Sequence, residues 1–217
     1  MKTWSRIGLA ATITLALGAG SATPAFADES VPSLAEAISL NQKYGDLSAA
    51  ELKALPRDEL ARIEDAAEVA TFDETTTVTY DAAATAVAAK SRSLQSTTAA
   101  RPVILCYTSR AQRTAKSAVG INLYMSYTVG GWCRSGSKVV SASLKASGSQ
   151  TYYLGWSSNG KIGGGSGVAS GQGRSYAQYK FTFQLGTPVP TQYPTPCVRV
   201  KGLGNASAQS DYTCGIY

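Results

Sequence analysis

The sequence predicts a mainly β protein: an antiparallel β-sandwich or small barrel with two disulfides. A signal peptide and a helical, partly disordered acidic leader are expected to precede it. Three observations support this prediction. Apolar and polar residues alternate along two long stretches in the second half of the chain, which is typical of half-buried strands. All four cysteines lie in that half, whereas nearly all acidic residues lie in the first half.

The N-terminus has the features of a secretory signal peptide. Lys2 and Arg6 precede the apolar stretch Ile7–Ala19, and Ala25–Ala27 offers the small residues that signal peptidase accepts. The apolar stretch is shorter than the about 20 residues that cross a bilayer, and no later segment is long or apolar enough. We therefore expect residues 1–27 to be removed and the mature protein to be secreted, with no transmembrane segment.

Residues 28–87 are predicted to form an acidic helical leader. The chain from residue 28 to residue 100 carries thirteen acidic and six basic residues. A short amphipathic pattern predicts a helix near Leu34–Tyr44, and the capping-box pattern Ser48–Glu51 predicts the start of a second helix. Large apolar side chains are too few here to bury a core alone. We interpret this part as a leader, a spacer or a segment that folds on a partner.

Residues 88–102 form the predicted linker. Their side chains are small, hydroxyl-bearing or basic, and the basic ones are Lys90, Arg92 and Arg101. An exposed linker of this composition is a usual place for proteolysis.

Residues 103–217 form the predicted basic β domain. Val119–Val129 and Ala177–Leu185 alternate with period two and are the best strand candidates. Asn159–Gly160 is predicted as a hairpin turn, and Gly163–Gly173 as a flexible hairpin loop. About seven short strands with one apolar face favour a sandwich or a small barrel. Weaker strands are expected at Val103–Thr108, Val139–Lys145, Thr151–Ser157, Val198–Lys201 and Asp211–Ile216.

The four cysteines are expected to form disulfides, because the count is even and the chain is expected to be exported. Metal binding is disfavoured because no two cysteines are close neighbours and the chain has no histidine. Four cysteines allow three connectivities. We favour Cys106–Cys133 and Cys197–Cys214, since each closes a local loop of strands. No metal site and no cofactor are expected.

The sequence also argues against catalysis. Without histidine, no Ser-His-Asp or Cys-His arrangement exists. Asp211 is the single carboxylate residue of the β domain, so paired carboxylates and a calcium site are missing there. We therefore expect no catalytic residues. An enzyme of unrecognised type, using serine and lysine, stays an alternative.

A basic, tyrosine-rich surface is the candidate binding site. From Arg101 onward, twelve basic residues accompany the single acid Asp211. This imbalance favours attraction to a polyanion, although scattered lysines also serve solubility and protect edge strands. Tyrosine rings on polar strand faces can stack on sugars or bases, or simply pack across strands. The candidate binding surface consists of Arg110, Arg113, Lys116, Tyr124, Tyr153, Tyr176, Arg199 and Lys201, the first three in an expected loop.

Three features of the sequence stand out together: the Ala-rich signal sequence, the stretch "YYLGWSSNGKIGGGSG" and the late pair "PCVRVKGLG…DYTCGIY". With these features the chain, mainly over Arg101–Tyr217, resembles uncharacterised secreted β-rich proteins of actinobacteria. It implies a source and a compartment, and no activity.

Two functional hypotheses follow. In the first, the protein is a secreted binding protein whose β domain contacts an anionic cell-wall, polysaccharide or other polyanionic surface. In the second, it is a latent secreted effector, such as a toxin, an inhibitor or an antimicrobial. Its acidic leader would then be a pro-region that docks on the basic domain and is cleaved near residues 90–101.

Overall fold

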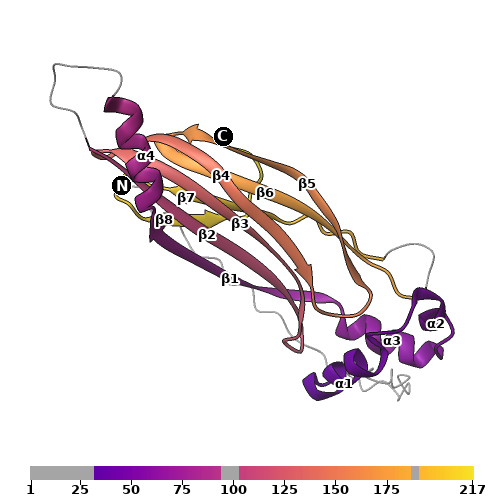
Figure 1. The fold of residues 1–217 in the computed structure, drawn as a ribbon. Helices are drawn as coiled ribbons and strands as arrows, with labels where there is room; N and C mark the ends of the chain where they lie inside the picture. Colours follow the sequence, from indigo (N-terminus) through magenta and orange to yellow (C-terminus); the bar gives the residue numbers. More distant parts are fainter. Residues whose placement is uncertain (1–31, 94–102, 187–190) are drawn as a thin grey trace, which may run out of the picture. The chain divides into compact units, whose positions relative to one another are not determined.

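Two four-stranded antiparallel sheets form most of the protein (Figure 1). The computed structural model describes residues 32–93, 103–186 and 191–217, so the predicted signal peptide and most of the predicted linker lie outside the described residues. The first sheet has the order β1-β2-β3-β4 and the second β5-β6-β7-β8. The predicted mainly β class, with antiparallel strands in two layers, is confirmed. The strands are β1 (Val69–Tyr80), β2 (Ile104–Ser117), β3 (Asn122–Ser135), β4 (Lys138–Thr151), β5 (Trp156–Ala169), β6 (Gln172–Phe183), β7 (Cys197–Gly202) and β8 (Ala208–Asp211).

Long hairpins connect β2, β3 and β4 in the first sheet. Gly120 and Gly136, with φ of +86° and +61°, lie in the two turns, where the backbone adopts a conformation that glycine tolerates best. The segment expected as a loop after the first strand instead continues β2 to Ser117. The small residues Ala111 and Ala115 explain this extension, because both are fully buried in the strand.

The second sheet begins with a β5–β6 hairpin that corrects two turn predictions. Asn159–Gly160 was the predicted hairpin turn, but it lies inside β5, where the pairing register shifts between Ser158 and Lys161. Gly160, with φ +88°, therefore serves a bulge. The turn is at Ser170–Gly171, both with positive φ, as a two-residue hairpin requires. The stretch expected as a flexible hairpin loop, Gly163–Gly173, contains this turn, but Gly163–Ala169 pairs with β6 instead of forming a loop.

Both predicted disulfides are present. Cys106 and Cys133 lie directly opposite each other on β2 and β3, with a Cα–Cα distance of 4.0 Å. Cys197, at the start of β7, is joined to Cys214 in the C-terminal segment. The described residues contain no free cysteine.

Small and hydroxyl-bearing residues fill the middle of the sandwich. A Cβ on Gly130 of β3 would lie 2.9 Å from the Cβ of Ser175 on β6, so the sheets approach each other closely there. The hydroxyls bond across the gap: Thr128 Oγ1 donates to Val198 O at 2.7 Å, and Ser175 Oγ donates to Ser143 O at 2.9 Å. These bonds satisfy buried polar groups that would otherwise destabilise the fold.

Strand β3 turns its polar face inward, opposite to the simplest interpretation of its alternation. Tyr124 stacks on Phe181 of the second sheet, with ring centroids 4.3 Å apart, and Thr128 bonds to that sheet. Further along, the indole of Trp132 donates to Leu203 O at 3.2 Å. The apolar Leu123 on the other face is also fully buried. Hydrophobicity alone therefore does not identify the inward face of this strand.

The leader helices share the main hydrophobic core with the sheets. They are α1 (Leu34–Tyr44), α2 (Ala49–Lys53) and α3 (Arg57–Ala66), and the predicted capping box begins α2. The cluster joins Leu40 and Ile63 of these helices to Trp156 and Phe181 of the second sheet. The indole of Trp156 also donates to Ala67 O, just after α3, at 3.3 Å. The helices thus complete a core that neither part buries alone.

Two further leader elements lie against the first sheet, and the sequence patterns indicated neither. Strand β1 pairs with β2 from Val69 to Tyr80 and forms the edge of the sheet. Helix α4 (Ala82–Ser93) follows, and it includes the first residues of the predicted linker. Where β1 ends, the Cys106 amide donates to Thr85 Oγ1 of α4 at 2.9 Å, so the helix replaces the missing strand partner. The division into a leader and a β domain, with proteolytic cleavage between them, stays a prediction.

Replacing Ile63 by alanine tests the shared core. Ile63 is fully buried, so the cavity should lower the free energy of unfolding by about 2–5 kcal/mol. Urea unfolding followed by tryptophan fluorescence should still give one transition, because Trp156 lies in the same cluster. Val87→Ala, at a residue that is 64% exposed on α4, is the control and should change stability by less than about 0.5 kcal/mol. An unchanged tryptophan transition in Ile63→Ala would show that the helices unfold separately.

Candidate functional site

The predicted site residues do not form one surface. Tyr124 and Tyr153 are only 2% and 3% exposed and belong to the main core, so they are not surface residues. Burial raises the pKa of each phenol to about 12. The other predicted residues lie on three separate parts of the two sheets.

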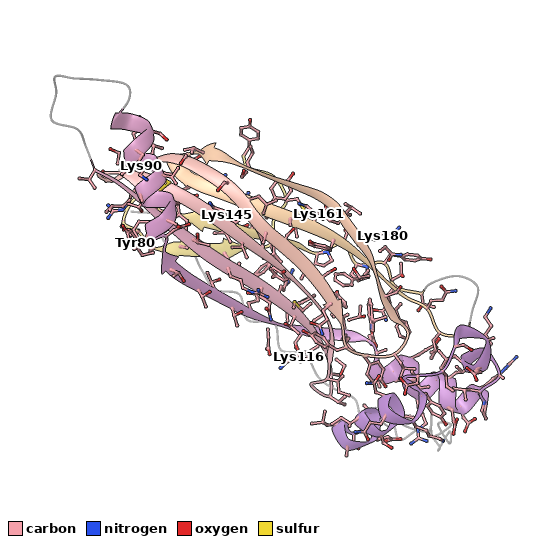
Figure 2. All side chains as sticks on the ribbon, in the orientation of Figure 1. Tyr80, Lys90, Lys116, Lys145, Lys161 and Lys180 are labelled. Atoms are coloured by element: carbon pink, nitrogen blue, oxygen red, sulfur yellow. A yellow bond between two sulfur atoms is a disulfide. The ribbon has the colours of Figure 1, made fainter. Side chains whose placement is uncertain are left out.

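Arg113 and Lys116 on β2 are covered by the leader strand β1. Arg113 Nε lies 3.4 Å from Glu74 Oε1, and Lys116 forms an ion pair with Asp73 (Figure 2 labels Lys116). The Arg113 guanidinium is also 3.8 Å from the centroid of the Phe72 ring. The leader therefore neutralises this part of the predicted basic surface within the same chain.

Arg110 is exposed on β2 and stacks on a tyrosine of β3. Its guanidinium lies 3.8 Å from the centroid of the Tyr127 ring, and it donates to Gln112 Oε1 at 3.2 Å. Gly148 on β4 makes room for this ring, since a Cβ there would overlap it. This pair presents one cation and is separate from the other predicted residues.

Tyr176, Arg199 and Lys201 are brought together on the second sheet. Tyr176 is the register partner of Arg199, and Arg174 is the partner of Lys201, so the four side chains form a block on β6 and β7. Their backbone neighbours on the opposite face of these strands, such as Val198, are buried in the core. The period-two pattern of β6 also places Gln178 and Lys180 on the outward face. We call Arg174, Tyr176, Gln178, Lys180, Arg199 and Lys201 the basic face; Lys180 is labelled in Figure 2.

Three members of the basic face, Arg174, Gln178 and Lys180, were not among the predicted site residues. All three belong to the alternation of β6: Arg174 precedes Tyr176 by two positions, and Gln178 and Lys180 follow it by two and four. The predicted strand began only at Ala177, so Arg174 fell outside it. Extending the pattern through Gly173 and Ser175, which are small but buried, would have found Arg174.

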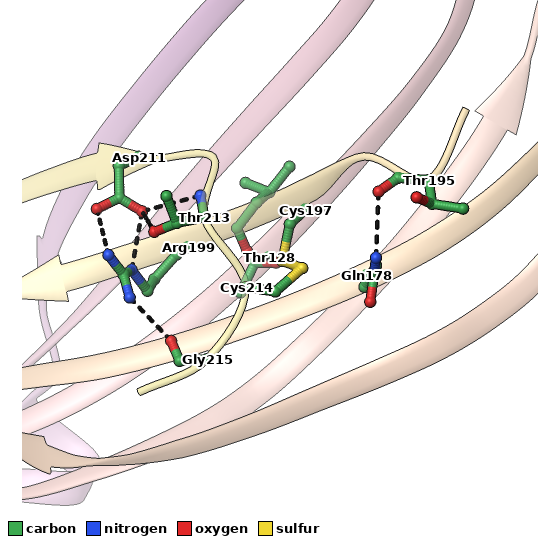
Figure 3. Close-up of a disulfide and its surroundings, with 10 residues drawn as sticks. Thr128, Gln178, Thr195, Cys197, Arg199, Asp211, Thr213, Cys214 and Gly215 are labelled. Carbon is green, nitrogen blue, oxygen red and sulfur yellow. Dashed lines mark hydrogen bonds and ion pairs between the residues drawn. A yellow bond between two sulfur atoms is a disulfide. The ribbon is translucent and has the colours of Figure 1, made fainter. Parts of the chain in front are cut away.

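Asp211 anchors one end of the basic face (Figure 3). Arg199 Nε and Nη2 lie 2.8 and 2.6 Å from the two Asp211 oxygens, and Lys201 Nζ lies 3.0 Å from Oδ2. Arg199 Nη1 also donates to Gly215 O at 2.9 Å. Burial alone would raise the pKa of Asp211, but hydrogen bonds from Arg199, Lys201 and Thr213 outweigh burial and hold it well below its usual range.

The C-terminal segment is fixed beside the basic face by a disulfide and by main-chain acceptors. Cys214 joins it to Cys197 of β7, and Arg174 Nη1 donates to Ile216 O at 3.2 Å. A carbonyl oxygen orients a guanidinium without cancelling its charge. Arg199 is only 7% exposed, so it is a buried partner of Asp211 and not a surface cation. The half-exposed cations of the basic face are Arg174, Lys180 and Lys201, and of these Lys201 also pairs with Asp211.

Three further observations bear on function. Within residues 32–93, 103–186 and 191–217, no three histidine, cysteine, aspartate or glutamate residues are grouped as metal ligands would be. None of the helices described is long and apolar enough to cross a membrane. No family model, curated protein or solved structure matches the chain.

Replacing Asp211 by asparagine should destabilise the protein at neutral pH by about 1–3 kcal/mol, because Arg199 and Lys201 lose their anionic partner. The folded-state pKa is lowered, so the stability from this carboxylate is present above its unfolded pKa of about 3.9. It is lost as the pH falls toward the folded pKa. Urea unfolding should be measured at pH 7 and below pH about 4. The difference in free energy of unfolding between wild type and Asp211→Asn should be smaller at the lower pH.

Glu68→Gln is the matched control, since Glu68 is exposed. It should change the unfolding free energy by less than about 0.5 kcal/mol at pH 7. A difference between wild type and Asp211→Asn that is the same at both pH values would contradict the role given to the ion pair.

Proposed function

We propose that the protein is a secreted, non-catalytic binding protein whose basic face holds an anionic polymer, such as a wall polymer or an acidic polysaccharide. The single observation that carries this proposal is the grouping of the half-exposed Arg174, Tyr176 and Lys201 on neighbouring strands. Disulfides form and persist mainly in proteins outside the cytoplasm, so the presence of two disulfides supports secretion.

The spacing of the cations suits a repeating anionic ligand. Alternate residues of a strand lie about 7 Å apart, and neighbouring strands about 5 Å apart. Arg174 and Lys180 therefore lie along one line on β6, with Lys201 on the next strand. Fixed cations at such distances attract a chain of phosphate, sulfate or carboxylate groups more strongly than a single anion, because several contacts form together.

Tyr176 and the glycines of β5 suit a sugar-containing polymer. Gly163, Gly165 and Gly167 are the register partners of Gln178, Tyr176 and Arg174, so β5 adds no side chains beside the basic face. A Cβ on Gly165 would lie 3.3 Å from the Tyr176 ring, which places the ring over the glycine. The Ile216 side chain covers Gly167 in a similar way, since a Cβ there would lie 3.0 Å from Ile216 Cδ1. A half-exposed tyrosine ring on a strand face can stack on a sugar ring.

The side chains of the basic face support binding rather than catalysis. Its carboxylate, Asp211, is held as an anion by Arg199 and Lys201 and accepts two bonds from Thr213. A carboxylate with a lowered pKa is a weak general base. The tightly fixed geometry instead keeps the cations in place for a ligand, which lowers the entropy lost on binding.

The double variant Arg174→Gln/Lys180→Gln tests the proposal. It should bind immobilised dextran sulfate and isolated anionic wall polymer about tenfold or more weakly. The slope of log K against log salt concentration should fall by roughly one per cation removed. The matched control is Lys53→Gln/Lys138→Gln, which removes the same charge from exposed positions on α2 and in the β3–β4 hairpin. Equal losses in both double variants would contradict a specific basic face and indicate a net-charge effect.

A second candidate function is the latent effector, and the ion pairs of Arg113 with Glu74 and Lys116 with Asp73 favour it. In that case the leader masks cations that act after its release. Release of the leader would require its helices to leave the shared core, and their removal would expose Trp156 and Phe181. Cleavage alone is then not sufficient for release.

A cut between the leader and the β domain should leave the two parts bound to each other. A site-specific protease sequence placed within residues 94–102 allows one cut. After cutting, the fragments should co-elute in native size-exclusion chromatography, also at high salt, because apolar contacts and the β1–β2 ladder hold them. They should separate in urea without reductant, since each disulfide lies within residues 103–217. A folded basic domain eluting alone directly after the cut would favour simple pro-region release.

A further inference from the structure

A cavity of about 480 Å³ lies between the leader helices and the turn that joins β4 to β5. The end of α1, the segment that follows it and Leu52 of α2 form one wall, and Thr151–Trp156 forms the other. Its volume falls in the range of about 300–1,000 Å³ that small-molecule sites occupy. It is separate from the basic face and shares no residue with it.

The wall of this cavity is held in place by a side chain of α1. Asn41 Oδ1 accepts from the Leu154 amide at 2.8 Å, and Asn41 Nδ2 donates to Tyr152 O at 3.4 Å. Both polar atoms of the asparagine side chain are thus used to fix the β4–β5 turn. The cavity is therefore preformed, which reduces the entropy cost of filling it.

A buried hydroxyl in the lining has no partner. Tyr153 lines the cavity and is 3% exposed, and its hydroxyl makes no hydrogen bond within the described part of the chain. A buried hydroxyl left unpaired destabilises a fold by about 1–3 kcal/mol. The oxygen itself is inaccessible to solvent, so it lies behind the cavity wall, and the groups open to a ligand are those at the rim.

The remaining lining residues favour a neutral polyhydroxylated ligand. Gln42 and Asp46 are exposed at the rim and offer an amide and a carboxylate, and the Tyr152 ring is 37% exposed. Planar amide and carboxylate groups accept hydrogen bonds from hydroxyls, and a tyrosine ring stacks on the apolar face of a sugar. Asp46 disfavours an anionic ligand by like-charge repulsion.

A second hollow of about 290 Å³ extends the first. Leu52, Gly155 and Trp156 line both, and the second hollow adds Lys53 and Ser157. A ligand that occupies both would lie along α2 and across the β4–β5 turn. A chain of two or more sugar units has this elongated form.

We infer that this cavity binds a neutral sugar unit, or a short neutral oligosaccharide, independently of the basic face. The protein would then have two sites for one wall or matrix: a polyanion site on the second sheet and a sugar site beside the leader. Linked sites of this kind raise the overall affinity for a polymer that reaches both.

The test is titration calorimetry of the full mature chain with maltotriose, cellotriose and triacetylchitotriose, each as a separate probe. At least one should bind with a dissociation constant of about 1 mM or tighter, and the affinity should not change with salt. Tyr152→Ala and Gln42→Ala should each weaken binding about tenfold with an unchanged melting temperature, since both side chains are exposed. Lys180→Gln, on the basic face, is the control and should bind the sugar as wild type does.

Tyr153→Phe removes the unpaired hydroxyl behind the cavity wall, so it should keep its fold and bind the sugar as wild type does. Loss of binding in Tyr153→Phe with unchanged binding in Tyr152→Ala would overturn the inference, because the ligand would then contact a different site. Failure of all three probes to bind at about 10 mM would also overturn it, without affecting the basic-face proposal. If dextran sulfate binds at this cavity more tightly than any neutral sugar, the inference that the ligand is a neutral sugar is wrong.

Discussion

The close approach of the two sheets is the constraint on which the rest of the fold depends. Gly130 opposite Ser175 brings the sheets near enough for hydroxyls to bond directly from one to the other. Glycine and serine bury little apolar surface, so the middle of the sandwich gains little from the hydrophobic effect. Large apolar contacts must therefore form elsewhere. They form around Trp132, which packs over Gly202, and around Trp156 beside the helices.

The leader helices follow from this need. Leu40 and Ile63 add apolar surface where Trp156 and Phe181 would otherwise face water. The leader had too few large apolar residues for a core of its own, and the sandwich alone has a small one. The leader and the sandwich each contribute apolar side chains to one shared core. This shared core explains why a segment of acidic, alanine-rich composition is folded at all. It also explains why charge attraction is not the main force between them, since exposed ion pairs contribute under about 1 kcal/mol each.

The sequence predicted the parts of this structure that local pattern controls. Alternation placed β3 and β6, and an even cysteine count with local loops gave both disulfides. The strands expected at Thr151–Ser157 and Asp211–Ile216 were wrong, because these residues lie mostly in the β4–β5 turn and in the C-terminal segment. Strand β1 was missed because it is an edge strand with nearly all side chains exposed, so Val69–Tyr80 shows no apolar alternation. The inward face of β3 was missed because its interior neighbours are glycine and serine. Arg174 was missed from the site because the alternation of β6 runs through small residues. In each case long-range packing, and not local pattern, decides the outcome.

The distribution of ion pairs explains why one sheet remains basic. Glu36 and Glu59 of the leader pair with cations of the helices, and Asp73 and Glu74 pair with Lys116 and Arg113 of β2, next to β1. Among the described residues, no ion pair joins a leader carboxylate to the second sheet, where Asp211 is the acidic partner. An acidic leader that served solubility alone would have no reason to neutralise one edge and leave the opposite sheet charged. Asp211 neutralises only part of the charge there, because Arg199 and Lys201 share this one carboxylate, and Arg174 is oriented by the Ile216 carbonyl. Fixing like charges close together opposes folding, so Asp211 and the disulfide-linked C-terminal segment are what keep this array ordered.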